Sequence, residues 1–283
     1  MYLVVTTMSA IDASAVKNFL CNWGNIGGLM LVLLLEEDEV SIRGEELKRV
    51  VGSSVELATY RAGQREKKSP MLEDIWEVFK QRTGYDAYIY VNGDILPSHP
   101  GADRGVLSSA DVGRVLAGRK VTFSKRRDFK NANDVPVIYK YGYDMFIVPS
   151  ELLGVVPSFI LKDWQIGQVG WDYALPLGIC KRYCITSTEL GIYHRIHRSA
   201  SQADWSSAML NLARSINWSW VTDLGLGKRL MFKLLISPLI INILTFTSPS
   251  VVGHIQRGVC YFYSRIIFYG LISGLLQDLD DIR

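Results

Sequence analysis

The sequence lacks the signatures of several common catalytic classes. The patterns HExxH, GxSxG, GxxxxGK[ST] and CxxC are all missing, so zinc-protease, serine-hydrolase and P-loop chemistry have no support. Cysteine is scarce, and the spacing of the four residues matches no zinc site: Cys21, Cys180, Cys184 and Cys260. A chain of 283 residues buries enough surface to fold without disulfides. We therefore interpret the cysteines as reduced thiols in a cytoplasmic protein.

Strong charge and long apolar runs are also missing. The net charge of +3 is too small to indicate a nucleic-acid partner, and none is expected. The N-terminus has no basic segment ahead of its short apolar run, so we expect no signal peptide. The longest apolar stretch, residues 230–246, is interrupted by Lys233, Pro238 and Asn242, whereas a transmembrane helix needs about 20 mostly apolar residues.

Acidic residues are missing from one long window. None occurs between Asp223 and Asp278, although the window holds five basic residues: Lys228, Arg229, Lys233, Arg257 and Arg265. Because the composition changes after about Ser215, we divide the chain into a domain over 1–215 and a helical C-terminal region over 216–283. The basic, aromatic-rich stretch 228–276 suits a segment in the membrane interface, which predicts peripheral attachment to the inner face of the cytoplasmic membrane. The alternative is a helical pair packed on the domain or on a second subunit.

Short apolar runs alternate with helical patterns through the first half of the chain. Strands are expected over residues 2–7, 29–35, 55–60, 86–91, 121–124 and 143–149, with helices up to Trp23, near 45–51, over 71–82 and through Leu177. Such alternation predicts an α/β fold with a mostly parallel, Rossmann-type sheet flanked by helices. Ligands of these sheets bind beyond the carboxyl ends of the strands. Thr6 and Thr7, an acidic patch at 36–39 and Asn92-Gly93-Asp94 are expected at that edge.

The segment Asn92-Gly93-Asp94 offers an amide and a carboxylate two residues apart after a buried strand. Hard oxygen ligands of this kind hold the divalent metal that neutralises a diphosphate leaving group. The alternative is a turn that ends the strand, since all three residue types favour turns.

Five segments in order resemble glycosyltransferases of the GT-A fold, including nucleotide-diphospho-sugar transferase-like proteins of bacteria and plants. They are YIYVNGDIL, SKRRDF, GYDMFIVP, IGQVGWDYALPL and YHRIH, within residues 1–200. The resemblance implies transfer of a sugar from a nucleotide-diphosphate donor to a glycan or lipid-linked acceptor, in surface polysaccharide synthesis. It also implies a divalent cofactor, Mn²⁺ or Mg²⁺, although the first acid of the family's DxD motif is Asn92 here.

The resemblance assigns roles to individual residues. Donor binding is expected from Thr6, Thr7, Asn92, Asp94, Arg126 and Arg127, metal binding from Asp94, His194 and His197, and acceptor binding from Asp144 and Trp171. Asp172 is expected to be the general base that takes the acceptor proton. Asp128 is a candidate to orient one of the two arginines.

Each assignment has a structural alternative. The basic segment 125–128 reads equally as a solvated loop, Asp144 as a hydrogen-bond hub, and Asp172 as a helix N-cap. The histidine pair reads also as ordinary surface or core histidines. Two other functions stay open: a non-catalytic nucleotide-sugar-binding scaffold of the same fold, and a nucleotidyltransferase, which would carry a glycine-rich loop after the first strand.

Overall fold

A computed structural model describes residues 1–8, 13–51, 55–63, 69–101, 106–139, 142–156, 158–168, 171–179 and 185–196. The predicted C-terminal region and His197 lie outside these residues, and so do Cys180, Cys184 and Cys260. Of the four cysteines, Cys21 is described, and it is an exposed free thiol. No helix in the described ranges combines the length and the apolar character needed to cross a membrane.

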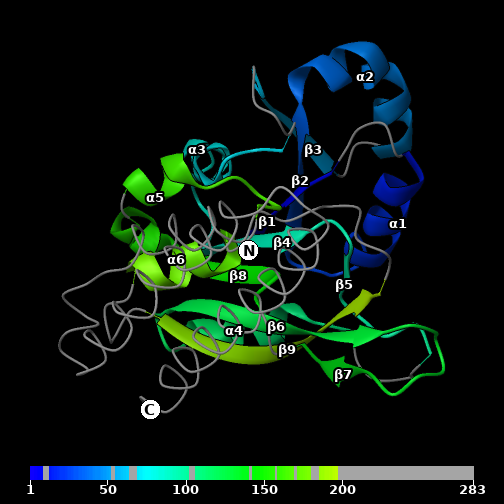
Figure 1. The fold of residues 1–283 in the computed structure, drawn as a ribbon, viewed down its shortest axis with the longest axis vertical. Helices are drawn as coiled ribbons and strands as arrows, with labels where there is room; N and C mark the ends of the chain where they lie inside the picture. Colours follow the sequence, from blue (N-terminus) through cyan, green and yellow to red (C-terminus); the bar gives the residue numbers. More distant parts are fainter. Residues whose placement is uncertain are drawn as a thin grey trace, which may run out of the picture.

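One mixed sheet forms the centre of the molecule (Figure 1). Its strands are β1 (Tyr2–Thr7), β2 (Leu29–Glu36), β3 (Val55–Tyr60), β4 (Ala87–Asn92), β5 (Ile95–Leu96), β6 (Val121–Phe129), β7 (Val137–Ile138), β8 (Met145–Pro149) and β9 (Ile185–Arg195). The order is β3-β2-β1-β4-β8-β6-β9-β5, with β7 paired to β6. Strands β3, β2, β1 and β4 are parallel to one another, as predicted, and β9 is parallel to β6. The pairings of β8, β5 and β7 are antiparallel.

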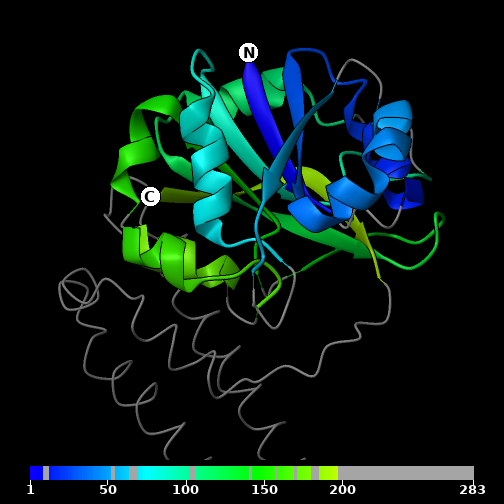
Figure 2. The same ribbon diagram turned by 90° about the horizontal axis from the view of Figure 1, so that it is seen from above.

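Helices cover both faces of the sheet. They are α1 (Ala13–Trp23), α2 (Glu37–Val51), α3 (Leu72–Gln81), α4 (Ser109–Leu116), α5 (Ser158–Asp163) and α6 (Trp171–Ile179), with a short 3₁₀ helix at Ser150–Val155. One apolar core joins the sheet to α3, α5 and α6, and a second joins its other face to α1, α2 and α4. In Figure 2 the cyan α3 and the blue α1 and α2 lie on opposite sides of the strands.

The central strands form because their residues are apolar on both faces. Leu31 to Leu35 of β2 and Ala87 to Val91 of β4 are fully or almost fully buried, as expected for strands covered by helices on both sides. The predicted helical stripe of α3 is also buried, with Ile75, Trp76 and Phe79 in the core.

Two predicted boundaries are wrong by more than two residues. Helix α2 begins at Glu37 rather than near 45, so Glu37, Asp38 and Glu39 of the acidic patch form its first turn, where carboxylates interact favourably with the helix dipole. Glu36 ends β2. Strand β6 runs on through Phe129. The basic segment 125–128 is therefore part of a sheet, and its side chains alternate between the two faces.

Candidate functional site

Polar side chains from five strands meet at the carboxyl edge of the sheet. The parallel strands β1 and β4 end at Thr7 and Asn92, which are register partners. Because β8 runs the opposite way, the residue before it, Asp144, lies at the same edge. The main-chain N–H of Asn92 donates to the Asp144 carbonyl oxygen at 3.0 Å. Strands β6 and β9 bring Asp128 and His194 together as register partners.

Arg126 and Asp144 form a largely buried ion pair. Arg126 Nη1 lies 2.7 Å from Asp144 Oδ1, and its Nε donates to Asp128 Oδ1 at 2.8 Å. Asn92 Nδ2 also donates to Asp144 Oδ1, at 2.8 Å, and the guanidinium stacks 4.0 Å from the Tyr139 ring centre. Burial lowers the pKa of Arg126, but the charges of Asp144 and Asp128 outweigh it and raise the pKa overall. Arg126 is thus held charged by two carboxylates of its own chain.

The Asp144 carboxylate is incompletely satisfied. Its side chain is 8% exposed, and its Oδ2 has no hydrogen-bond partner among the described residues. Burial raises the pKa of Asp144 above its ordinary value, against the opposing effect of Arg126. Loss of the arginine would leave a buried carboxylate without its main countercharge.

Asp94, His194 and Asp128 form a second cluster next to the first. His194 Nε2 lies 3.3 Å from Asp94 Oδ2, and its Nδ1 lies 3.1 Å from Asp128 Oδ1. Burial lowers the pKa of His194, but hydrogen bonds to Asp94 and Asp128 reverse the effect and raise it. The turn at Gly93 that carries Asp94 is tight, since a Cβ there would lie 2.9 Å from the Thr7 carbonyl oxygen.

A hydrogen-bonded chain connects the sheet core to this edge. Thr7 Oγ1 and Tyr90 Oη are 3.1 Å apart, and Tyr90 Oη donates to Asn92 Oδ1 at 3.0 Å. The Tyr90 ring also packs edge-on against Trp171, with 5.6 Å between ring centres. Asn92 is thus fixed on both sides, by Tyr90 and by Asp144.

A cleft of about 830 Å³ opens over the same edge. Thr7, Asn92, Asp94 and Trp171 line it among the predicted site residues; other described lining residues include Asn18, Phe19, Asn22, Leu96, Phe129, Ile166 and Arg195. Its volume is in the range of small-molecule binding sites. The cleft therefore has room for a nucleotide sugar or part of one.

Six of the predicted residues are not among the described residues that line the cleft: Thr6, Arg126, Arg127, Asp144, Asp172 and His194. Thr6 is fully buried in β1, and its hydroxyl has no hydrogen-bond partner in the described part of the chain. Arg127 projects from the other face of β6, where its Nη2 lies 3.1 Å from Glu189 Oε2. Arg126 is enclosed by its two carboxylates, and Asp128 takes the orienting role predicted for it.

Asp172 lies at the start of α6, next in sequence to Trp171, which lines the cleft. Its Oδ2 accepts a hydrogen bond from the Tyr143 main-chain N–H at 3.1 Å. The carboxylate packs so closely on Gly142 that a Cβ there would come within 2.1 Å of Oδ2. Burial and the nearby charge of Asp144 raise the pKa of Asp172 to about 7. That value suits a general base at neutral pH, although Asp172 is not among the described residues that line the cleft.

Metal binding would rest on Asp94 and His194. The described residues contain no group of three His, Cys, Asp or Glu side chains arranged to hold a metal ion. Asp94 and His194 nevertheless supply a carboxylate and an imidazole 3.3 Å apart. An Nδ1–H donated to Asp128 would leave the Nε2 lone pair facing Asp94, the arrangement in which histidines bind divalent metals. The donor set fits a two-residue site completed by substrate and water.

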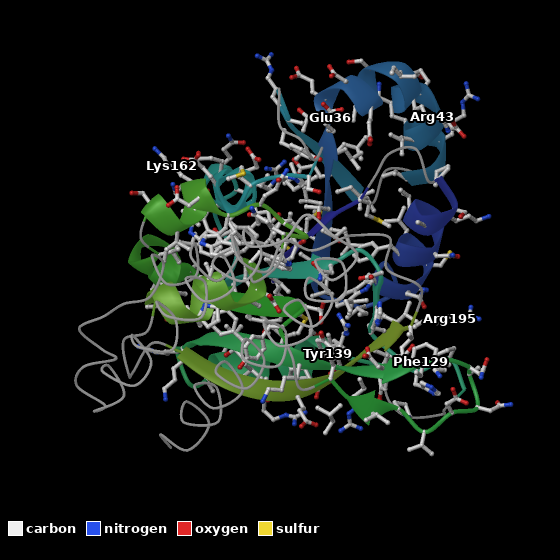
Figure 3. The ribbon with its side chains drawn as sticks, in the orientation of Figure 1. Glu36, Arg43, Phe129, Tyr139, Lys162 and Arg195 are labelled. Carbon is white, nitrogen blue, oxygen red and sulfur yellow. The ribbon has the colours of Figure 1, made fainter. Side chains whose placement is uncertain are left out.

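The sequence interpretation missed several residues of the site. Tyr90 precedes Asn92 by two residues in β4, and residues two apart in a strand point to the same face. The alternation alone therefore predicts that Tyr90 lies beside Asn92. Tyr139 and Arg195 reach the site through strand pairings of β6 that no local pattern predicts. Figure 3 shows Phe129 and Arg195 near each other at the ends of β6 and β9.

Comparison with known proteins gives structural neighbours of low sequence identity. No family model matches the sequence, and no curated protein matches it. Residues 1–349 of S. aureus TarS, solved with UDP-GlcNAc, are 10% identical with a TM-score of 0.48, over 98% of this chain and 90% of that chain. The glycosyltransferase GlyE of Streptococcus pneumoniae is 11% identical with a TM-score of 0.43, over 78% and 63%. A protein assigned as a nucleotide-diphospho-sugar transferase in Desulfovibrio desulfuricans is 10% identical with a TM-score of 0.44, over 78% and 97%.

These neighbours are GT-A glycosyltransferases, the class that the sequence resembles. All three TM-scores are below 0.5. The fold is therefore assigned from the strand order of this chain, and its chemistry is inferred from the residues of its own site.

Proposed function

We propose that this protein is a glycosyltransferase that moves a sugar from a nucleotide-diphosphate donor to a glycan or lipid-linked acceptor, in surface polysaccharide synthesis. One observation carries the proposal. Asn92, Asp94 and His194 gather at the carboxyl edge of the parallel strands, beside a cleft of about 830 Å³. This is the edge at which open α/β sheets bind nucleotides.

The donor diphosphate would lie near Asp94. We propose that Asp94 and His194 hold a divalent metal, Mn²⁺ or Mg²⁺, with His197 as a further candidate ligand. When bound, the metal would neutralise the charge that develops on the departing nucleoside diphosphate. The chain itself prepares the site, since Asp128 orients the His194 ring at 3.1 Å and Tyr90 orients Asn92 at 3.0 Å.

The acceptor would lie on the Trp171 side of the cleft. Trp171 lines the cleft, but most of its side chain is packed in the core, so it would contact a sugar ring only through the part that faces the cleft. Asp172, with a pKa of about 7, is the proposed base for the acceptor hydroxyl. Asp144 would act mainly as the countercharge of Arg126 rather than as a direct acceptor ligand.

A turnover assay tests the proposal. The full chain is incubated with UDP-, GDP- and dTDP-sugars, Mn²⁺ and a membrane-glycan extract, and released nucleoside diphosphate is measured. We expect release from one donor class, reduced at least about 100-fold in Asp94→Asn, because the charge that develops on the leaving group would lose its stabilisation. Glu45→Gln, an equally conservative loss of an exposed carboxylate on α2, is the control and should match the wild type. Release that is equal in Asp94→Asn and wild type would contradict the proposed site.

One observation favours a second candidate, a nucleotide-sugar-binding protein without turnover. Asp172, the proposed base, hydrogen-bonds the Tyr143 main chain and is outside the described cleft lining. Donor binding that depends on Asp94, with no nucleoside diphosphate released for any donor, would support this candidate over the enzyme.

A further inference from the structure

The cleft has a charge of each sign. Among the described residues that line it, Asp94 is the only acid and Arg195 the only Lys or Arg. The antiparallel register of β5 and β9 pairs Ile95 with His194, so Asp94 and Arg195 lie opposite each other just beyond the ladder. Asp94, a carboxylate that could bind a metal, and Arg195, a cation that could bind an anion, are therefore neighbours in the cleft lining.

Arg195 uses one of its guanidinium nitrogens in a hydrogen bond to a described residue. Its Nε donates to the Lys130 carbonyl oxygen at 3.4 Å. Its two terminal nitrogens form no hydrogen bond or ion pair with any described residue. Two or more N–H donors of one guanidinium match a tetrahedral oxyanion in a bidentate way.

The other arginines of the region are already committed. Arg126 is neutralised by Asp128 and Asp144 within 2.8 Å. Arg127 pairs with Glu189 on the other face of β6. Of these three arginines, Arg195 is therefore the one available to bind a phosphate in the cleft. The sequence resemblance instead assigns phosphate binding to Arg126 and Arg127.

Helix α1 adds amide groups to the lining of the cleft. Asn18 and Asn22 are four residues apart, so they share one face of the helix, and both line the cleft. Asn22 Nδ2 donates to the Asn18 main-chain oxygen at 2.6 Å, which fixes the Asn22 side chain and leaves its second N–H and its oxygen available. Carboxamides donate to phosphate oxygens and both donate to and accept from sugar hydroxyls.

We propose that Arg195, Asn18 and Asn22 form a subsite for the phosphoryl group of a sugar phosphate. The inference rests on the proposed function for its ligand class. The phosphoryl group has two possible sources, the diphosphate of the nucleotide donor or a phosphate carried by the acceptor. Both supply the same tetrahedral oxyanion, and a competition experiment separates them.

The test uses inorganic phosphate as the probe, with binding to the full chain measured by isothermal titration calorimetry. The variants are Arg195→Gln, Arg195→Lys and Asn22→Ala, and Arg43→Gln on α2 is the control. Arg43 is an exposed arginine well away from Arg195 in Figure 3. Since Arg195→Gln removes a charged hydrogen-bond donor, we expect it to weaken phosphate binding at least about tenfold. Arg195→Lys should retain part of the affinity, Asn22→Ala should lose a smaller part, and Arg43→Gln should match the wild type.

A second titration, with Mn²⁺ and saturating UDP, GDP or dTDP present, identifies the source. Phosphate displaced by the nucleotide assigns the subsite to the donor diphosphate, and phosphate bound beside the nucleotide assigns it to the acceptor. Absence of phosphate binding in the wild type, or equal binding in Arg195→Gln, would overturn the subsite. Nucleotide binding that depends on Asp94 but is unchanged in Arg195→Gln, without phosphate binding, would overturn the subsite alone and leave the proposed function standing.

Discussion

Replacing Arg126 tests whether it is a structural countercharge or a phosphate ligand. Arg126→Met keeps much of the side-chain volume and removes the charge. The change leaves the Asp144 carboxylate, 8% exposed, with the Asn92 amide as its remaining described hydrogen-bond donor. Removing one partner of a buried ion pair costs about 3–5 kcal/mol. Because Arg126 itself is 16% exposed, we expect a loss near the lower end, about 3 kcal/mol.

A double-mutant cycle isolates the interaction. Asp144→Asn removes the negative charge while its side-chain oxygen still accepts from Asn92. In the double variant no buried carboxylate is left unpaired, so we expect it to be more stable than Arg126→Met alone by about 1–2 kcal/mol. Additive losses would mean that the two side chains do not interact as the distance of 2.7 Å implies.

The assay is urea unfolding followed by tryptophan fluorescence, with the free energy of unfolding taken from the linear dependence on urea. Trp76 and Trp164 are fully buried reporters of the core next to this edge. A loss below about 1 kcal/mol in Arg126→Met, together with weaker nucleotide binding, would refute the structural role and favour the phosphate role that the sequence resemblance implies.

Three further predictions follow from single contacts. Because the folded-state pKa of Asp172 is raised to about 7, the folded protein holds a proton that the unfolded chain releases near pH 4. The wild type should therefore lose stability relative to Asp172→Asn as pH rises from about 4 to 7, by at most about 1.4 kcal/mol per pH unit; parallel urea midpoints across this range would contradict the raised pKa. Gly93→Ala would put a Cβ 2.8 Å from Met8 Cγ, so we expect the free energy of unfolding in urea to fall by about 1–3 kcal/mol. The control is Gly44→Ala in α2, where the nearest atom to the new Cβ would be Val40 Cγ1 at 3.7 Å; it should be neutral or stabilising. His194→Gln should weaken Mn²⁺ binding at least about tenfold in an electron paramagnetic resonance titration, and unchanged affinity would remove His194 from the metal site.

The parallel half of the sheet was predictable because its residues carry the information locally. Strands β1, β2 and β4 are largely continuous apolar runs, a pattern typical of strands buried on both faces. The carboxyl edge follows from their direction, and Thr7 and Asn92 were predicted there and lie there as register partners.

The ion pairs of the site were not predictable in the same way. Asp128 and His194 are 66 residues apart in sequence and meet only because β9 pairs with β6. Arg126 and Arg127 look equivalent in the sequence, yet strand alternation directs one to Asp144 and the other to Glu189. The strand boundary at Phe129 decides this, and boundaries are the least certain part of any pattern-based prediction.

Other predictions on the site depend on ligands rather than on the fold. Asp172 was singled out by its neighbour Trp171 and by the resemblance, and its catalytic role stays a prediction. Arg195 is not predictable from the sequence, because one arginine between two histidines resembles any surface cation. Its place beside Asp94 becomes visible only once β5 and β9 are paired.

The most direct test of the account is a thermal-shift screen of the purified chain against UDP, GDP, CMP and dTDP, each with and without Mn²⁺. The account predicts that one nucleotide raises the melting temperature, that Mn²⁺ enlarges the shift, and that Asp94→Ala removes it, because a ligand stabilises the folded state that binds it. No shift with any of the four nucleotides, or a shift that Asp94→Ala leaves intact, would contradict a nucleotide-sugar site at this edge of the sheet.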